Sequence, residues 1–531
     1  MTTMKVLVCD GVSPKGIAIL EQDFEVEARK KISAEELLAE IPNYDGLIVR
    51  SASKVTAEVI EAAKNLKVIG RAGVGVDNID VEAATKKGII VLNAPEGNTI
   101  AATEHSVAMM LAMARNIPQA HKSLKGDREW RRSDFVGVEL RGKTLGVFGM
   151  GRIGSGVAKR ALAMEMNVIG YDPYLNEERA KQLGIEIGTV DEIYEKADFI
   201  TLHMPKTPQT KGMIGAEAIA KMKDGVRIVN CARGGIIDEA ALAEALKSGK
   251  VAGAAIDVFD GEPVNMDNPL LDCDNIVVTP HLGASTKEAQ IGVAVDVAYG
   301  VVAALKGEPV MTAVNMAHVA PHVMKQIRPF FSLAERMGCT AVNLAEGAIK
   351  NVEVEYTGDI TQYDTKMLTT AAIKGMLNPI LNEDVNYVNA PGMAAQRNIK
   401  VKEVKLNETR SFANLITLKV VSEKGAHTIQ GTLFGDEERL VSIDGQRVDV
   451  DPHARLLICP HINRPGVIGT IGSLLGGKGI NISGMQVSKT EDQGTNIMVL
   501  TVDNDVPQAV MEEVLAIDGI FGAKLVDFHA L

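Results

Sequence analysis

Short apolar runs alternate with segments of helical spacing through the first half of the chain. Residues 6–8, 47–49, 68–69 and 90–92 are such runs, and no charged residue interrupts them. Continuous apolar runs are typical of strands buried on both faces, and strands that alternate with helices predict a parallel sheet. We therefore expect an α/β fold in which ligands bind beyond the carboxyl ends of the strands.

The pattern changes beyond about residue 315. Strands with alternating polarity are predicted at 352–356, 415–421 and 427–434, beside a helix at 324–337, which together indicate an α+β domain. The last stretch predicts strands at 456–462, 480–488, 496–503 and 523–528 and helices at 465–475 and 507–517. This β-α-β-β-α-β order is ferredoxin-like, with Pro465 expected in the first turn of its helix.

Residues 144–172 carry the strongest local signal. Gly149, Gly151 and Gly154 fit G-x-G-x-x-G, and they lie between an apolar run and a segment of helical spacing. In such a unit the first glycine permits a tight turn, the second lets the backbone approach a pyrophosphate, and the third lets helix and strand pack closely. The phosphates would lie at the helix N-terminus, where free N–H groups favour negative charge.

Asp172 follows the second apolar run of this unit, 172 − 154 = 18 residues after the last glycine. An acid about 20 residues on binds the ribose hydroxyls of a dinucleotide. Pro173 and Tyr174 follow it, so no basic neighbour is present to receive a 2′-phosphate. The pattern favours NAD over NADP, and the alternative is a glycine-rich turn that is only structural.

Composition limits the classes of function. The 531 residues carry a formal net charge of −12, which argues against a general nucleic-acid binder. The five cysteines contain no C-x-x-C pair, so we expect a reducing compartment, no disulfide framework and no metal site. Neither a signal peptide nor a membrane-spanning apolar stretch is recognisable, so a cytoplasmic protein without a membrane partner is expected.

Polar residues at strand ends supply candidate chemistry. Arg50 and Arg71 end two of the apolar runs, where bidentate guanidinium groups suit a carboxylate or phosphate, although a surface ion pair is the alternative for each. Arg233, Glu262 and His281 follow later strands. A histidine base, a carboxylate that orients it and an arginine that binds a substrate carboxylate are the groups that oxidation of a hydroxy acid requires.

Four segments carry a family resemblance: 149–154, 230–235, 257–263 and 279–286. With them the chain resembles the D-2-hydroxyacid dehydrogenases, and segments 45–52 and 70–78 resemble their phosphoglycerate dehydrogenase branch. The resemblance implies NAD-dependent oxidation of 3-phospho-D-glycerate to 3-phosphohydroxypyruvate, the entry to serine synthesis. It also implies that the protein is a homodimer or homotetramer.

The resemblance also implies roles for individual residues. His281 would be the acid/base, Glu262 its partner, and Arg233 the group that binds the substrate carboxylate and carbonyl. The substrate positions would be Arg50, Ser51, Arg71 and Gly73. The cofactor positions would be Gly149, Gly151, Arg152, Ile153, Gly154, Asp172, Cys231, Ala232, Asp257, Gly283 and Ala284. Val74 stands where some relatives have threonine, so a side-chain hydrogen bond to the cofactor is not expected there.

The implied fold has four parts. A flavodoxin-like α/β substrate domain would comprise 1–99 and 283–315, around a Rossmann-type doubly wound NAD domain at 100–282. An intervening α+β regulatory domain at 316–453 would precede a ferredoxin-like ACT domain at 454–531. In the resemblance the ACT domain binds serine between paired copies, through residues that match His461, Asn463 and Asn481. A module that only dimerises is the alternative.

Two other functions stay open from the residues. The substrate could be another small 2-hydroxy acid, such as glycerate or hydroxypyruvate. The chain could instead be a non-catalytic protein that senses nicotinamide cofactors, as corepressors with this fold do. Trp130, the single tryptophan, lies beside two arginines and suits either a substrate lid from a neighbouring subunit or a packing anchor.

Overall fold

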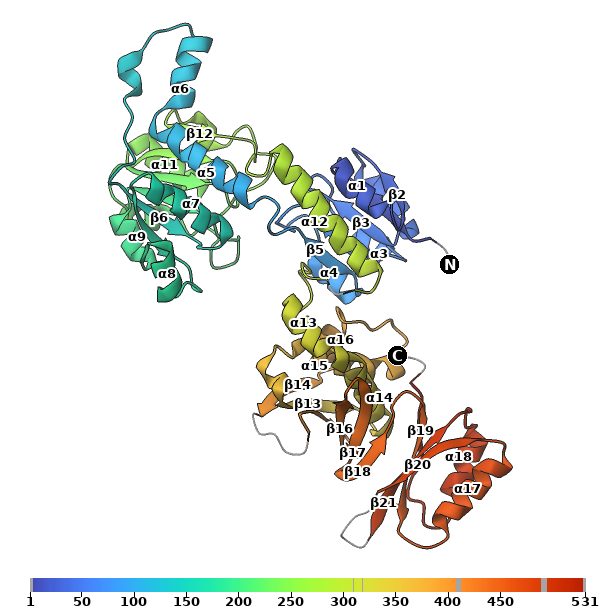
Figure 1. Cartoon of the computed structure of the whole chain (residues 1–531). Coiled ribbons are helices and arrows are strands. Elements are labelled where there is room, and N and C mark those ends of the chain that lie inside the picture. The colour runs from blue at the N-terminus through green and yellow to red at the C-terminus, as the bar shows by residue number, and fades with distance from the viewer. Residues whose placement is uncertain (1–2, 309, 318, 407–411, 489–493, 529–531) are drawn as a thin grey trace.

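The computed structural model describes residues 3–308, 310–317, 319–406, 412–488 and 494–528 (Figure 1). Four sheets follow one another along the described chain. They lie between Lys5 and Asn93, between Thr144 and Val278, between Ile349 and Val450, and between Arg455 and Val526. Each sheet falls inside one of the four domain ranges expected from the sequence, and the exact domain boundaries stay a prediction.

The first sheet is wholly parallel, with strand order β2-β1-β3-β4-β5. This is the flavodoxin-like order, whose switch point lies between β1 and β3. The helix α2 begins with a capping box, in which Ser33 and Glu36 satisfy each other's backbone N–H groups. The elements are β1 (Lys5–Val8), α1 (Pro14–Leu20), β2 (Glu25–Ala28), α2 (Ala34–Glu40), β3 (Gly46–Val49), α3 (Ala57–Ala62), β4 (Val68–Arg71), α4 (Val81–Lys86) and β5 (Ile90–Asn93). We call this unit the substrate lobe.

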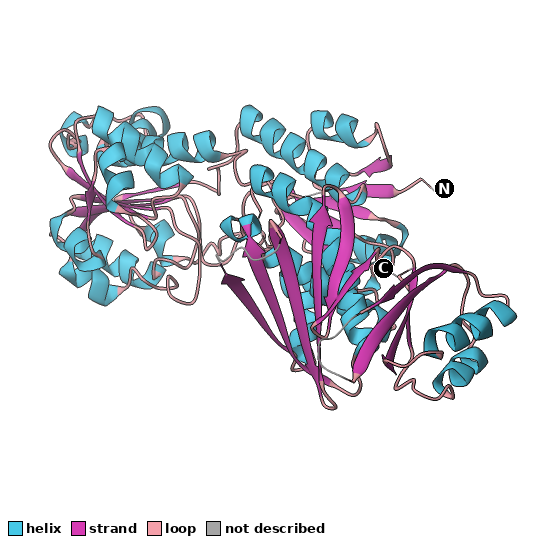
Figure 2. Ribbon diagram, turned by 60° about the horizontal axis from the view of Figure 1, so that its bottom comes forward, coloured by secondary structure: helices cyan, strands magenta, loops and turns pink. Residues whose placement is uncertain are grey.

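The second sheet, also parallel, forms the nucleotide lobe, with order β12-β11-β10-β9-β6-β7-β8. Helices cover both of its faces (Figure 2). Its strands are β6 (Thr144–Phe148), β7 (Asn167–Tyr171), β8 (Glu186–Ile187), β9 (Phe199–Leu202), β10 (Val226–Asn230), β11 (Val251–Ile256) and β12 (Ile276–Val278). Its helices are α7 (Arg152–Ala163), α8 (Glu177–Leu183), α9 (Val190–Lys196), α10 (Ala216–Lys221) and α11 (Glu239–Ser248). The doubly wound sheet predicted from the sequence is confirmed, and only the two-residue, exposed β8 was not foreseen.

Two helices connect the lobes: α5 (Thr99–Ala114) leads out of the substrate lobe, and α12 (Lys287–Leu305) leads back (Figure 1). The segment that leads into α5 meets α12 at Gly97, where a Cβ would lie 2.8 Å from the backbone nitrogen of Val293. α12 is long and apolar enough to cross a membrane, but it packs on the substrate-lobe sheet, where a Cβ on Gly70 would meet Val297 and Val301. Its apolar composition is therefore that of a core helix.

An arm extends from the nucleotide lobe after α5 (Figure 1). It comprises α6 (Ile117–His121), the π-helical turn η2 (Lys122–Gly126) and the 3₁₀ turn η3 (Arg132–Phe135). Trp130 lies on this arm and is 80% exposed. Within this chain it is therefore not a packing anchor.

The third sheet has order β14-β13-β15-β16-β17-β18, antiparallel except for the β13–β14 pair. Its strands are β13 (Ile349–Gly358), β14 (Lys400–Leu406), β15 (Asn414–Ser422), β16 (Ala426–Phe434), β17 (Glu437–Ile443) and β18 (Gln446–Val450). The helices are α13 (Pro321–Ile327), α14 (Phe331–Leu344), α15 (Lys366–Leu377) and α16 (Ala390–Gln396). The single helix predicted at 324–337 was wrong. A 3₁₀ turn with Pro329 separates α13 from α14, because proline lacks the N–H that a continuous helix needs.

The fourth sheet has order β20-β21-β19-β22, and all its pairs are antiparallel. Its elements are β19 (Arg455–Ile462), α17 (Val467–Gly477), β20 (Ile482–Val487), β21 (Thr495–Val502), α18 (Gln508–Leu515) and β22 (Lys524–Val526), so the predicted ferredoxin-like order is confirmed. The prediction that Pro465 lies in the first turn of the helix was wrong. Gly466 takes a left-handed φ of 97°, and the helix begins after it. One buried cluster joins this sheet to the third, since Ile458, Val499 and Phe528 pack with Leu333 and Met337.

We predict that Gly97→Ala lowers the stability of the two-lobe unit. The added methyl would overlap the backbone of Val293, which cannot rotate away as a side chain would. Overpacking of this kind lowers the free energy of unfolding by about 1–3 kcal/mol, measurable by urea unfolding. The control is Gly392→Ala in α16, where no atom lies within 4 Å of the new methyl. Equal stability of both variants and the parent would contradict the close crossing.

Candidate active site

The three glycines between β6 and α7 differ in what surrounds them. Gly149 has a φ of 90°, and a Cβ there would lie 2.5 Å from the carbonyl oxygen of His203. A Cβ on Gly154 would lie 1.9 Å from the carbonyl oxygen of Gly149, whereas nothing lies within 4 Å of one on Gly151. The first glycine therefore makes the turn, the third allows close packing, and the second leaves its backbone open to a ligand. This geometry fits a pyrophosphate at the N-terminus of α7.

Asp172 follows β7 and lies beside this loop. Its Oδ2 accepts a hydrogen bond from the Met150 N–H at 2.8 Å, and its Oδ1 accepts one from Tyr174 at 2.9 Å. The carboxylate therefore holds the middle of the glycine loop. Among the other cofactor positions, Arg152 forms a 2.7 Å ion pair with Glu96 of the substrate lobe, and the half-buried Ile153 follows it in α7.

Arg233 lies in a loop that follows β10 and is folded by its neighbours. The Asn230 side chain accepts from the Ala232 N–H at 3.0 Å and donates to the Arg233 carbonyl at 2.9 Å. A Cβ on Gly234 would lie 1.8 Å from the Phe259 carbonyl oxygen, so glycine is required where this loop touches the next. The contact brings the Arg233 loop against the loop that carries Glu262.

His281 and Glu262 form the expected pair. His281 Nδ1 lies 2.6 Å from Glu262 Oε2, and the other Glu262 oxygen accepts from the Phe259 N–H at 3.1 Å. Burial would raise the pKa of Glu262, but the hydrogen bonds from His281 and Phe259 outweigh it and hold that pKa below its ordinary value. A carboxylate on Nδ1 assigns the proton to that nitrogen, which leaves Nε2 available to a substrate hydroxyl.

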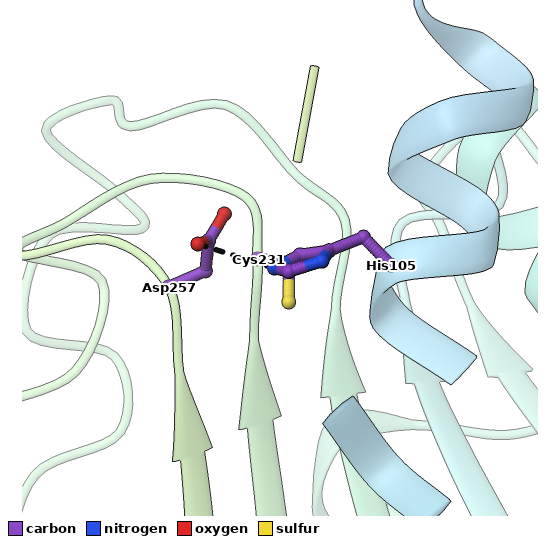
Figure 3. A group of neighbouring side chains, drawn as sticks. All are labelled: His105, Cys231 and Asp257. Atoms are coloured by element: carbon purple, nitrogen blue, oxygen red, sulfur yellow. Dashed lines mark ion pairs between the residues drawn. The ribbon is translucent and has the colours of Figure 1, made fainter. Parts of the chain in front are cut away.

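The buried carboxylate of Asp257 organises the loop that carries His281. One oxygen accepts from the Leu282 N–H at 2.7 Å and from the Thr279 hydroxyl at 2.5 Å, and the other accepts from the Gly283 N–H at 2.9 Å. His105 of α5 adds a contact from its Nε2 at 3.2 Å (Figure 3). Burial would raise the pKa of Asp257, but the hydrogen bonds from His105, Thr279 and Leu282 keep it below its ordinary value.

Cys231 completes a group with His105 and Asp257 whose donor atoms lie within 4.8 Å of one another (Figure 3). Metal binding would require the thiolate. Burial first, and the charge of Asp257 second, raise the pKa of Cys231 to about 12. The Asp257 oxygens are also already engaged by protein donors. The chemistry of this group therefore favours a hydrogen-bonded support for the cofactor side rather than a metal centre.

The substrate lobe contributes guanidinium groups to the same region. The Arg71 side chain passes over Gly73, where a Cβ would lie 1.5 Å from its Nη1. Its Nε is buried and has no hydrogen-bond partner in the described structure. Burial, and next the positive charge of Arg233, lower the pKa of Arg71 to about 10. An unpartnered, buried guanidinium nitrogen beside other arginines is suited to bind an anion.

Arg50 and Ser51 are positioned by residues that sequence reasoning missed. Asp10, after β1, accepts from the backbone N–H groups of Arg50 and Ser53. Asn78 donates to the carbonyls of Arg50 and Ser53 at 2.8 and 2.6 Å. These contacts fix the loop after β3 at the switch point of the sheet, where ligands of parallel sheets bind. Asp10 and His105 are common polar residue types far in sequence from the groups they support, so no local pattern signals them, whereas Thr279 lies in segment 279–286, which carries the family resemblance.

The three effector candidates do not meet within one chain. His461 is buried on β19, with its Nδ1 3.3 Å from the Cys459 carbonyl, and Asn463 follows the end of that strand. Asn481 precedes β20 and donates to Asp503 at 2.5 Å. The register pairs Ile482 and Arg455 each with Val502, so Asn481 lies at the opposite end of the sheet from Asn463. A site that uses all three residues needs two copies of the domain.

Comparisons with known proteins cover nearly all of the chain. Residues 107–283 match the model of the D-isomer specific 2-hydroxyacid dehydrogenase NAD-binding domain. Residues 326–444 match the D-3-phosphoglycerate dehydrogenase intervening domain, and 456–519 match the ACT domain. Similar proteins include the D-3-phosphoglycerate dehydrogenase of Archaeoglobus fulgidus, 47% identical over 99% of this chain and 100% of that protein. The D-3-phosphoglycerate dehydrogenase of Bacillus subtilis is 44% identical over 98% of this chain and 99% of that protein.

Solved structures match the two-lobe part. A glyoxylate reductase from Paecilomyes thermophila superposes with a TM-score of 0.54 at 32% identity, covering 59% of this chain and 99% of that one.

We predict that Thr279→Val destabilises the protein in a pH-dependent way. The folded-state pKa of Asp257 is depressed, so its ionised form contributes stability above the pKa of an unfolded aspartate, about 3.9. That contribution is lost as the pH falls through the folded-state value. Removing the hydroxyl should lower the free energy of unfolding by about 1–3 kcal/mol near pH 7, and the deficit should shrink at about pH 3, below the pKa of an unfolded aspartate.

Urea unfolding at both pH values measures this effect. Thr470→Val is the control, since that exposed hydroxyl donates only to a helix carbonyl. A deficit that does not change with pH would show that the hydroxyl does not support the charge of Asp257.

Proposed function

The chain belongs to the D-3-phosphoglycerate dehydrogenase family, and from this premise we propose which residues carry its reaction. It is an NAD-dependent oxidoreductase that converts 3-phospho-D-glycerate to 3-phosphohydroxypyruvate, the first committed step of L-serine biosynthesis. The observation that carries the proposal is the His281–Glu262 pair, which lies at the same sheet edge as Arg233 and the glycine loop.

Three arginines bind the substrate in this proposal. Arg233 takes the carboxylate, and Arg50 and Arg71 take the phosphate. The buried, unpartnered Nε of Arg71 supports a substrate with a second anionic group, because an uncharged hydroxymethyl group would leave that nitrogen unsatisfied. Phosphoglycerate is therefore favoured over glycerate and other simple 2-hydroxy acids.

His281 removes the proton of the C2 hydroxyl through Nε2, while Glu262 holds the Nδ1 proton and stabilises the imidazolium that forms. Arg233 stabilises the negative charge on the oxygen as it becomes a carbonyl. Bound NAD supplies the acceptor for the hydride that leaves C2. The intact acid/base pair argues against a protein that only senses the cofactor.

The glycine loop and Asp172 hold the dinucleotide in the proposal. The open space at Gly151 receives the pyrophosphate, and Arg152 and Ile153 begin the helix at that point. Asp172 binds the ribose hydroxyls, while Cys231, Ala232, Asp257, Gly283 and Ala284 line the nicotinamide side.

We predict that the protein forms NADH from 3-phospho-D-glycerate and NAD, and that Arg50→Ala lowers kcat/KM for this substrate. Loss of a charged hydrogen bond of about 1.5–3 kcal/mol corresponds to a decrease of roughly tenfold to a hundredfold. The Kd for NAD should stay unchanged, because Arg50 lies in the substrate lobe. Lys54→Ala, which removes an exposed charge from the same loop, is the control. An equal loss of NAD binding would contradict the role of Arg50.

We propose that the ACT domain binds L-serine between two copies. The separation of Asn463 and Asn481 at opposite sheet ends supports this, since two copies side by side can bring one residue of each kind together. Serine should then inhibit NADH formation, and Asn463→Ala should raise the serine concentration for half inhibition about tenfold or more. Gln508→Ala, at the exposed start of α18, should leave it unchanged. Turnover indifferent to serine would make the domain a dimerising module or the site of another effector.

We propose a cytoplasmic homodimer or homotetramer. The arm from α6 to η3 exposes Ile117, Leu124, Trp130 and Val136, each at least 53% accessible. Clustered exposed apolar side chains favour coverage by another protein surface, and a second copy is the partner that the ACT proposal already requires. In the described chain the five cysteines are free, in keeping with a reducing compartment.

A further inference from the structure

Asp77 of the substrate lobe contacts Arg233 of the nucleotide lobe. Asp77 Oδ2 lies 3.3 Å from Arg233 Nε. Both side chains closely approach Gly75, where a Cβ would be 2.1 Å from Arg233 Nη2 and 2.6 Å from Asp77 Oδ2. The guanidinium therefore reaches across to the neighbouring lobe and is met there by a carboxylate.

The loop that carries Asp77 is fixed from both sides. Asn93 donates to the Val74 carbonyl at 2.6 Å, and Asn78 is bonded to the Arg50 loop. The Asp77 side chain is 75% exposed, and the ion pair with Arg233 is the contact that the described residues give its carboxylate. The backbone presents this carboxylate to Arg233, while the side chain stays free to turn into solvent.

Two further arginines lie near the pair. Arg71 lies close enough to Arg233 for the two charges to repel, and Arg50 adds to the same repulsion. The negative charge of Asp77, and to a smaller extent that of Asp10, offsets this repulsion at Arg71. Asp10 is engaged by the backbone of the Arg50 loop, so Asp77 is the acid that contacts the arginine cluster directly.

We propose that Asp77 limits substrate affinity by competing with the substrate carboxylate for Arg233. This inference rests on the proposed function, in which Arg233 binds that carboxylate. Binding then exchanges one carboxylate for another at Arg233, so the exchange itself contributes little affinity. The net affinity must come from the second anionic group at Arg50 and Arg71. A 2-hydroxy acid with a carboxylate alone therefore binds weakly, and a phosphorylated one binds well.

The test compares Asp77→Asn with the parent enzyme, using 3-phospho-D-glycerate and unphosphorylated D-glycerate as substrates with NAD. The amide keeps the shape of the side chain and removes its charge. The KM for each acid should fall roughly two- to fivefold, as the loss of a partly exposed ion pair allows. The Kd for NAD should not change. Asp77→Glu, which keeps the charge, should retain a KM close to that of the parent.

Glu82→Gln is the control for overall charge, because Glu82 is an exposed acid on the neighbouring α4 that pairs with Lys86. Its KM values should equal those of the parent. A KM that rises in Asp77→Asn would mean that Asp77 orients Arg233 instead of competing for it, and an unchanged KM would mean that it does neither. Either result overturns the inference about Asp77. The proposed function still stands in that case, provided that the parent enzyme turns over phosphoglycerate. Absence of parent turnover would instead remove the proposed function.

Discussion

A buried carboxylate needs donors, and the arrangement of this active site follows from how Asp257 obtains them. Its donors come from the connecting helix α5, from the end of β12 and from the backbone after His281. A charge left unpaired in the interior is costly, so each of these segments is fixed with respect to the others. The loop of His281, which has a left-handed φ of 55°, is therefore held by Asp257. The same carboxylate contacts His105 of α5, the helix that leads from one lobe to the other.

Close backbone approach is the second constraint on the site. Gly75, Gly97, Gly154 and Gly234 each lie where a methyl group would overlap a neighbouring segment. Two of these contacts, at Gly75 and Gly97, are between the lobes or their connections, and the other two shape the nucleotide loop and the Arg233 loop. Side chains that act on small ligands must converge within a few ångströms, and backbone contacts without intervening Cβ atoms allow loops from separate strands to do so.

Much of this site could be predicted from the sequence, because its main residues follow strands with strong local patterns. The glycine loop, Arg233, Glu262 and His281 stand directly after apolar runs, and parallel strands deliver their ends to one edge. The supporting residues could not be found in this way. Asp10, Asp77, His105 and Thr279 act through contacts with segments up to 174 positions away, as between His105 and Thr279, so the supporting roles of Asp77 and Thr279 stayed hidden although both lie in segments of the family resemblance. The predicted bounds of the helices near Pro329 and Pro465 were wrong, because the local backbone geometry at Pro329 and at Gly466 determines where these helices end or begin.

The C-terminal half constrains how an effector could influence this chemistry. The third and fourth sheets share one buried cluster, so the two α+β parts behave as a packed unit. That unit contacts the substrate lobe at Gly88, whose carbonyl accepts a hydrogen bond from Asn386 at 2.8 Å. Gly88 precedes β5, at the opposite end of that strand from Asn93 and the Asp77 loop. A displacement of the substrate lobe through this contact would act against the close crossing of Gly97 and Val293. Such a displacement changes the distance between Arg50 and Arg71 in one lobe and Arg233 and His281 in the other, on which binding of a doubly anionic substrate depends.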